Sequence, residues 1–188
     1  FAGGRGKRMF PLTEDTPKPM LKIGGIPLLE SVLNTLKNQG FYNFVISLNY
    51  LSKKIKDYLS TKKDQINLNY IVERNKLGTA GPLSLLKSKN RKPIICMNGD
   101  IYTNLKFESL IDYHLKSNNF CTICTRNYSF RVPYGVVSRG KEIINEKPEV
   151  SKKISAGIYV FNRDALKFLK KNKYIDMNDF VNMLYKKK

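Results

Sequence analysis

The feature of the sequence that most constrains its fold is the alternation of short buried strands with amphipathic helices. Three segments have the length and apolar content of buried strands: 43–48, 66–72 and 92–98. Helical segments precede, separate and follow them, at 26–40, 51–62, 80–88 and 107–118. This β-α-β-α-β-α order predicts an α/β fold with a mostly parallel sheet and helices on both faces.

The pattern changes from about Phe120 onward. Four segments with short connections read as strands, at 120–126, 134–139, 142–147 and 155–162. They predict an antiparallel or mixed extension of the sheet, which two helical segments at 163–171 and 177–186 complete. Because no repeat, low-complexity tract or linker interrupts the chain, we expect residues 1–188 to form a single domain.

Two carboxylates directly follow predicted strands. Ligands of an open α/β sheet gather outside the carboxyl ends of its parallel strands. Glu73 follows the strand at 66–72, and Asp100 follows the strand at 92–98. A hard carboxylate at that edge suits Mg²⁺ bridging phosphates, which makes Asp100 a candidate metal ligand. The alternative is that Asn98-Gly99 is only a type I′ hairpin turn.

The opening stretch combines glycines, cations and prolines, in the order FAGGRGKRMFPLTEDTPKPM. Glycine lets backbone N–H groups approach a ligand and Arg and Lys favour anions, so this loop is typical of a phosphate site. It matches neither usual phosphate loop, since G-x-x-x-x-G-K-[ST] needs glycine at Phe1 and G-x-G-x-x-G needs it at Met9. A basic loop without function is the alternative. The prolines on both sides of Lys18 argue against it, because each fixes φ.

At this point the chain resembles a known family. The segment from Ala2 to Leu21 is similar to the signature of nucleotidyltransferases that make nucleotide-sugars, A-G-G-x-G-[TS]-R-[LM]-x-P-L-T followed by P-K-P. Five further matches follow in family order: LGTAGPLSLL at 77–86, NGD at 98–100, PYGVV at 133–137, EKP at 146–148 and AGIYVF at 156–161. The likeness is closest to mannose-1-phosphate and glucosamine-1-phosphate guanylyltransferases. It implies a Rossmann-like three-layer sandwich with a mostly parallel mixed sheet, the nucleotidyltransferase (glycosyltransferase-A-like) fold.

The resemblance implies a reaction and its catalytic groups. A sugar-1-phosphate oxygen attacks the α-phosphorus of a nucleoside triphosphate and expels pyrophosphate, with Mg²⁺ as cofactor. In this reading Arg8 neutralises the leaving pyrophosphate, Lys18 contacts the transferring phosphate and Asp100 holds the metal. Such transfers need aligned reactants and compensated charge more than covalent help.

The resemblance also implies two groups of binding residues. The nucleotide would be bound by Ala2, Gly3, Gly4, Gly6, Glu73, Gly78 and Thr79. Glu73 would face the base, and guanine N1–H and N2–H₂ offer a carboxylate two donors, which favours GTP. The sugar-phosphate would be bound by Tyr134 and Gly135 beside the ring, Glu146 on the hydroxyls and Lys147 on the phosphate. For Glu146 and Lys147 a turn with a surface ion pair is the alternative.

The chain departs from the family pattern in three respects. Relatives have a hydrophobic strand before A-G-G, and a second metal carboxylate in a W-x-D-[VT]-G segment after the last helix. Neither occurs here, and Asp176 and Asp179 do not match that segment. We therefore expect that a few N-terminal residues and a C-terminal continuation are lacking. Lys7 stands where Thr or Ser is usual, and Ser155 where Asn is frequent.

The charge of the chain raises a second class of partner. Lys and Arg number 34 against 15 Asp and Glu, a net charge of +19, which attracts any polyanion. The lysines are scattered and lack the aromatic-flanked basic stripe of a nucleic-acid reader, so we predict no nucleic-acid partner. The alternative functions are a non-catalytic nucleotide-binding relative of the family and a basic nucleic-acid-binding protein.

The sequence contains no apolar segment of membrane-span length and no signal peptide. We therefore expect no membrane partner and a cytoplasmic location. Assembly into a homo-oligomer is possible.

The cysteines and the single histidine receive structural assignments. Cys121 and Cys124 form a C-x-x-C match on a predicted strand, which would send them to opposite faces. We therefore expect these two and Cys96 to be buried thiols and not a redox or zinc site. His114 lies on a helix with an apolar face, and we expect a structural role for it.

Overall fold

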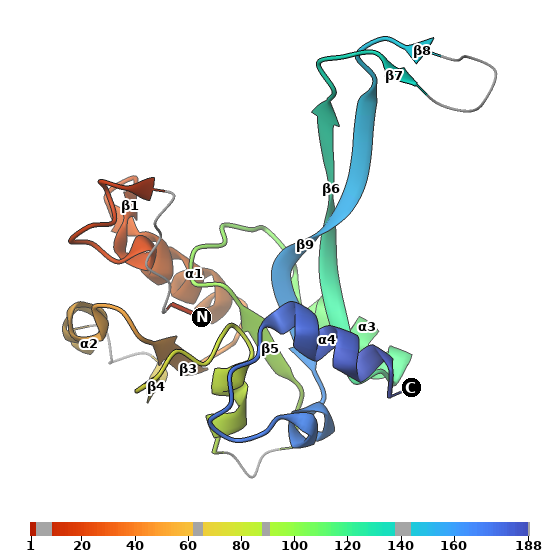
Figure 1. Cartoon of the computed structure of the whole chain (residues 1–188). Coiled ribbons are helices and arrows are strands. Elements are labelled where there is room, and N and C mark those ends of the chain that lie inside the picture. Colours follow the sequence, from red (N-terminus) through yellow and green to blue (C-terminus); the bar gives the residue numbers. More distant parts are fainter. Residues whose placement is uncertain (3–8, 62–65, 88–90, 138–143, 188) are drawn as a thin grey trace. The chain divides into compact units, whose positions relative to one another are not determined.

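The structure is a computed structural model that describes residues 1–2, 9–61, 66–87, 91–137 and 144–187 (Figure 1). It divides into two compact units, one formed by residues 1–122 and 159–188 and the other by residues 123–158. The expectation of one catalytic domain stays a prediction. Among the described helices, none combines the length and the apolar content needed to cross a bilayer.

The first unit contains the α/β part of the chain. Its helices are α1 (Leu28–Lys37), α2 (Ser52–Ser60), α3 (Phe107–Ser117) and α4 (Met177–Tyr185). Its strands include β1 (Lys22–Ile23), β2 (Ile26–Pro27), β3 (Asn43–Leu48), β4 (Asn67–Val72) and β5 (Ile94–Met97). Short 3₁₀ helices complete it: η2 (Lys18–Met20), η4 (Gly81–Leu85) and η5 (Arg163–Phe168). The predicted helices at 26–40, 51–62, 107–118 and 177–186 and the predicted strands at 43–48, 66–72 and 92–98 are therefore confirmed as elements.

Residues Phe1 and Ala2 lie between two pieces of the sheet. Strands β3 and β4 pair in parallel, and β5 is followed across its sheet by β9 (Glu149–Phe161) and β6 (Cys121–Arg131). Phe1 N donates to Met97 O at 2.7 Å, and Gly99 N donates to Phe1 O at 2.9 Å, which is the hydrogen-bond pattern of a parallel pair. Ala2 N donates to Ser47 O at 3.0 Å. Phe1–Ala2 thus bridges β5 and β3, as expected for the end of a strand.

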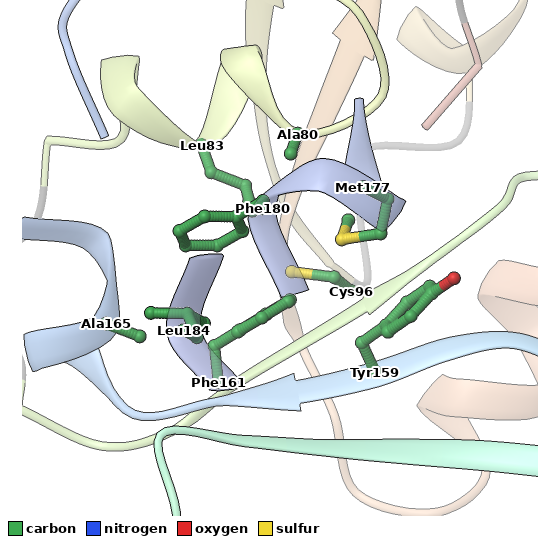
Figure 2. Close-up of a cluster of buried hydrophobic side chains, with 9 residues drawn as sticks. All are labelled: Ala80, Leu83, Cys96, Tyr159, Phe161, Ala165, Met177, Phe180 and Leu184. Carbon is green, nitrogen blue, oxygen red and sulfur yellow. The ribbon is translucent and has the colours of Figure 1, made fainter. Parts of the chain in front are cut away.

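Two apolar clusters form the core of this unit. The first contains Ala80, Leu83, Cys96, Tyr159, Phe161, Ala165, Met177, Phe180 and Leu184, and Figure 2 shows α4 packing its apolar face into it. The second contains Ala2, Leu29, Leu33, Ile46, Leu48, Ile55 and Leu59, where α1 and α2 cover β3. Phe1 packs on the first cluster and Ala2 belongs to the second. Consecutive residues of an extended chain point to opposite faces, so the clusters cover the two faces of the sheet.

The second unit is an antiparallel β-ribbon. It contains most of β6 and β9, together with the two-residue pair β7 (Val136–Val137) and β8 (Ile144–Asn145). β6 and β9 are longer than the apolar segments predicted, with 11 and 13 residues. The additional residues are mostly exposed, so no buried face gives them the apolar alternation by which strands are detected.

Two predicted helices are 3₁₀ turns instead. The segment predicted at 80–88 forms η4 (Gly81–Leu85), with Pro82 in its first turn, and the segment at 163–171 forms η5 (Arg163–Phe168). In the first case Gly81 disfavours a longer helix and proline supplies no N–H group to it. Apolar periodicity over so few residues does not distinguish the two kinds of helix.

Candidate functional site

Asp100 follows β5 at a point where the backbone segments are closely packed. A Cβ atom at Gly99 would lie 3.2 Å from Phe1 O and 3.3 Å from Leu29 Cδ1, so a side chain there would have to displace its neighbours. Gly99 therefore permits the hydrogen bond to Phe1 and sets Asp100 at the carboxyl end of the strand. The next element is α3, not a paired strand, so the hairpin-turn alternative for Asn98-Gly99 is wrong.

Lys18 reaches this strand end from the opening segment. It begins η2, where Met20 N donates to Pro17 O at 2.7 Å, and both Pro17 and Pro19 are buried. The prolines fix the backbone around the lysine, as expected. Lys18 Nζ forms an ion pair with Asp100 Oδ2, and the two side chains are 37% and 20% exposed. The structure therefore brings together the predicted cation and the predicted acid.

The loop that joins Ala2 to this region is only partly described. Gly3, Gly4, Gly6 and Arg8 lie outside the described residues. Ala2 is buried and its N–H group is bonded to Ser47 O, so that N–H is part of the sheet. Its position beside the Gly99 backbone places the start of the glycine loop at the strand ends that carry Asp100.

Glu73 follows β4 and lines a cavity of about 400 Å³. Its Oε1 accepts a hydrogen bond from Ser47 Oγ at 2.7 Å, and its Oε2 accepts one from Leu77 N at 3.0 Å. The carboxylate is thereby oriented by β3 on one side and by the following loop on the other. Each carboxylate oxygen has a second lone pair, so Glu73 can still accept donors from a ligand.

The loop Leu77–Gly81, which contains Gly78 and Thr79, is held by the segment before α4. Leu77 O accepts from Ile175 N at 3.0 Å, and Ile175 O accepts from Ala80 N at 3.0 Å and Gly81 N at 3.2 Å. Gly78 has φ +77°, and a Cβ atom there would lie 2.5 Å from Ile175 O. Only glycine satisfies both conditions, so Gly78 allows the close packing of this loop.

Asp176 is a residue that sequence reasoning missed. It matches no metal motif, yet its Oδ1 accepts hydrogen bonds from Thr79 N at 3.1 Å and from Thr79 Oγ1 at 3.3 Å. Tyr174 OH donates to Asp176 Oδ2 at 2.7 Å. The hydrogen bond from Tyr174 and those from Thr79 hold the pKa of Asp176 below its usual range. The hydrogen bond to Asp176 also raises the pKa of Tyr174. Its position directly before an apolar helical repeat was the only local signal.

Thr79 and Asp176 also line a second cavity, of about 330 Å³. Asn98, Tyr159 and Asn178 also contribute polar side chains to it, and Phe1 contributes to its wall. Asn98 is two residues before Asp100, so this cavity adjoins the strand end that carries the acid.

The four predicted sugar-phosphate residues lie together in the second unit. Lys147 N donates to Tyr134 O at 3.2 Å, and a Cβ atom at Gly135 would lie 3.1 Å from Glu146 Oε2. Lys147 Nζ is 3.6 Å from Glu146 Oε1, with both side chains mostly exposed. The surface ion pair of the alternative is therefore present, and the role of these residues in binding stays a prediction.

His114 and Cys96 are buried as expected, whereas Cys121 and Cys124 are only partly buried. His114 is fully buried, with Nδ1 2.8 Å from Thr122 Oγ1 and Nε2 3.2 Å from Asn162 Oδ1. Cys96 is buried, Cys121 and Cys124 are partly buried, and all three thiols are free. Burial raises the pKa of each, to about 12 for Cys96 and Cys121. Within the described part of the chain, no three His, Cys, Asp or Glu side chains gather as metal ligands.

Comparison with known proteins places this geometry in a family. The sequence model described as Nucleotidyl transferase matches residues 1–187. The chain is 34% identical over 177 residues to a mannose-1-phosphate guanylyltransferase catalytic subunit beta of Drosophila pseudoobscura pseudoobscura, covering 88% of this chain and 48% of that protein. It is 32% identical over 173 residues to a protein of Sulfolobus acidocaldarius named as a mannose-1-phosphate guanyltransferase, with the same two coverages.

A solved structure shares the fold. The crystal structure of HddC from Yersinia pseudotuberculosis superposes with a TM-score of 0.71 at 25% identity, covering 92% of this chain and 79% of that one. The α/β class and the mixed sheet predicted from the sequence are thus confirmed. The chain spans about half the length of the curated relatives it matches. From the family match over residues 1–187 and the order of its motifs, we conclude that the chain belongs to the nucleotidyl transferase family.

Proposed function

We propose that the protein transfers a nucleoside monophosphate from a nucleoside triphosphate, with GTP favoured, to a sugar-1-phosphate. The products are a nucleotide-sugar and pyrophosphate. Family membership and the names of the relatives, which are mannose-1-phosphate guanylyltransferases, support this reaction class. Because nucleoside triphosphates are the substrates, we propose the cytoplasm as its location.

The observation that carries the proposal is the contact between Lys18 and Asp100. These residues are far apart in the sequence, yet their side chains meet at the carboxyl end of β5, beside the start of the glycine loop at Ala2. A cation and a hard acid that meet at a strand end are groups that a polyphosphate requires. The partial exposure of both side chains leaves them accessible to a ligand.

Lys18 would act on the phosphate that is transferred. The proline-fixed turn holds its backbone near Asp100, so its ammonium group can compensate the charge that develops on the α-phosphate oxygens. Arg8, carried by the glycine loop, would neutralise the leaving pyrophosphate. These roles need positioning and charge and no covalent intermediate on the protein.

Asp100 fits Mg²⁺ by the chemistry of its side chain. It supplies a hard oxygen at the ligand edge and already attracts one cation, the Lys18 ammonium. Mg²⁺ is commonly held by one or two carboxylates together with substrate phosphates and water, so a single carboxylate is compatible with it. When held by Asp100, the ion would supply positive charge that offsets the negative charge of the substrate phosphates.

Glu73 would select the base. Its two oxygens accept hydrogen bonds from Ser47 and Leu77, and Glu73 lines a cavity of about 400 Å³. The remaining lone pairs suit the N1–H and N2–H₂ donors of guanine. In the second unit, Tyr134, Gly135, Glu146 and Lys147 would bind the sugar-phosphate. The proximity of these four residues within that unit supports their acting together.

The proposal is tested by pyrophosphate release. The full-length protein is incubated with Mg²⁺ and each pair of one nucleoside triphosphate with one sugar-1-phosphate, including mannose-1-phosphate and 2-amino-sugar-1-phosphates. Release only when GTP and a sugar-1-phosphate are both present is the expected result. Binding of GTP in a thermal-shift assay without release from any pair would instead identify a non-catalytic relative.

A further inference from the structure

Asp176 makes an unusual number of contacts with a loop distant in the sequence. Its Oδ1 accepts hydrogen bonds from both the backbone N–H and the hydroxyl of Thr79, which is 97 residues away. The Thr79 hydroxyl in turn accepts a hydrogen bond from Met177 N at 2.7 Å. Thr79 and the first residues of α4 are therefore joined in both directions, as donor and as acceptor.

Backbone hydrogen bonds around this contact restrict the conformation of the loop Leu77–Gly81. Ile175, directly before Asp176, pairs with Leu77, Ala80 and Gly81 through three backbone hydrogen bonds. These bonds hold the two ends of the loop, and the Asp176 carboxylate holds its middle at Thr79. Tyr174 orients the carboxylate through its second oxygen. Removing Asp176 would release the middle of the loop while leaving both ends in place.

The position of the loop connects this contact with ligand binding. Leu77 lines the cavity that contains Glu73, and its N–H group orients the Glu73 carboxylate. Thr79 lines the second cavity together with Asn98, which precedes Gly99 and Asp100. The same loop thus forms part of the wall of both cavities, and a change in its conformation would alter both.

We infer that Asp176 is a positioning residue of the nucleotide site, which keeps the loop Leu77–Gly81 in its binding conformation by accepting hydrogen bonds from Thr79. This inference rests on the proposed function, because it takes the two cavities to be where the nucleotide and its partner bind. Asp176 needs no contact with substrate for this role. Its effect is transmitted through Thr79 to the loop, and through the Leu77 N–H group to Glu73.

The inference predicts a separation of binding from chemistry. Asp176→Ala should raise the Kd and KM for the nucleotide roughly tenfold, a factor that corresponds to about 1.4 kcal/mol. It should leave kcat at saturation within about twofold, because Lys18 and Asp100 are untouched. Thr79→Val should raise the same constants. The double variant should lose less affinity than the sum of the two single variants, because the bond from the Thr79 hydroxyl to Asp176 is removed by both substitutions.

Three further variants separate positioning from a general loss of structure. Asp176→Asn retains an oxygen that can accept from Thr79, so it should recover most of the nucleotide affinity. Tyr174→Phe removes only the contact to Oδ2 and should have a smaller effect than Asp176→Ala. Asp179→Ala, an exposed carboxylate in the first turn of the same helix, is the matched control and should bind nucleotide as the wild type does.

A second measurement does not depend on activity. Hydrogen exchange of the Thr79 amide should be faster in Asp176→Ala than in the wild type and unchanged in Asp179→Ala, since its acceptor is lost only in the former. If Asp176→Ala does not fold, the nucleotide Kd and KM of Thr79→Val, which loses the hydroxyl bond to Asp176 but keeps the amide bond, provide the test, and unchanged values would overturn the inference.

The outcomes distinguish this inference from the proposed function. If the wild type releases pyrophosphate and Asp176→Ala retains its Kd and KM, the inference is wrong and the function stands. A fall in kcat at unchanged KM would overturn it equally. If the wild type binds no nucleotide and releases no pyrophosphate, the proposed function itself is wrong, and the exchange data then report only on loop order.

Discussion

At the scale of single residues, the Lys18–Asp100 ion pair should contribute little to the stability of the fold and much more to ligand binding. Both side chains are partly exposed, and ion pairs of this kind contribute about 0–1 kcal/mol to the free energy of unfolding. The pair is therefore weak as a structural contact. Its position at the carboxyl end of β5, beside Ala2 and Gly99, is what gives it a role in binding an anion.

Lys18→Ala should accordingly reduce turnover much more than stability. Turnover should fall on the order of 100-fold or more, because one well-placed charge is lost where negative charge develops. The free energy of unfolding should change by about 1 kcal/mol or less. Pyrophosphate release and chemical denaturation measure the two effects. Lys22→Ala, which removes an exposed lysine on β1, is the control and should alter neither. Near-normal turnover of Lys18→Ala would contradict the catalytic role.

The three thiols provide a prediction about pH. The thiolate is the reactive form, and burial raises the pKa of Cys96 and Cys121 to about 12 and also raises that of Cys124. Since a raised thiol pKa lowers the thiolate fraction at every pH below it, native protein at pH 8 should react slowly with a disulfide reagent. The rate should increase on raising the pH and on unfolding. Fast reaction of Cys121 and Cys124 in the native protein would instead support a redox role for the C-x-x-C motif.

At the scale of elements, the loop Leu77–Gly81 and the start of α4 behave as one structural piece. The loop follows β4, and the helix begins at Met177, 96 residues after Gly81 (177 − 81). Ile175, just before the helix, nevertheless joins the two by three backbone hydrogen bonds. The close approach depends on Gly78, whose φ of +77° and lack of a side chain admit the Ile175 carbonyl. The packing of the loop against the segment before α4 is therefore sensitive to a side chain at Gly78.

Two glycine substitutions test this dependence. Gly25 and Gly78 both have positive φ, at +82° and +77°, but only Gly78 has a neighbouring atom where a Cβ would stand. Gly25→Ala should cost about 1–2 kcal/mol of unfolding free energy from the backbone conformation alone. Gly78→Ala should cost about 2 kcal/mol more, because Ile175 must also move. Thermal or chemical denaturation gives both values, and equal losses would show that the contact with Ile175 is unimportant.

At the scale of the whole molecule, two features bear on substrate binding: the net positive charge and the division of the chain into two units. The net charge of +19 favours the approach of anions of every kind, including both proposed substrates. The residues proposed for the nucleotide belong to the first unit, and those proposed for the sugar-phosphate belong to the second. Each group is assembled within its own unit by local packing and hydrogen bonds.

The charge predicts a salt dependence for substrate capture. The value of kcat/KM for the nucleotide should fall as salt is raised from about 0.01 to 1 M, because the Debye length shortens from roughly 30 to 3 Å. A nonionic osmolyte at equal osmolality is the control and should have little effect. If DNA binds tightly, its affinity should fall by about 10³ or more between 50 and 200 mM salt. Retention of specific DNA binding at physiological salt would favour the nucleic-acid rival.

Much of the first unit could be predicted because its signals are local. Helices α1, α2, α3 and α4 and strands β3, β4 and β5 have the apolar periodicity or the apolar runs expected of them. The extent of β6 and β9 could not be predicted, because most of their residues are exposed and lack the apolar alternation that a buried face produces. The 3₁₀ form of η4 depends on Gly81 and Pro82 in a segment too short for periodicity to decide.

The sequence by itself determined the fold class, the family and the residue types of the site, because strand and helix patterns and the spacing of Gly, Lys and Asp are properties of short segments. Only the tertiary structure decided which side chains meet: Lys18 with Asp100, Glu73 with Ser47, and Thr79 with Asp176. The physical reason is that these contacts depend on how the strand ends and loops pack in three dimensions. No pattern within a short segment specifies a partner up to 97 residues away.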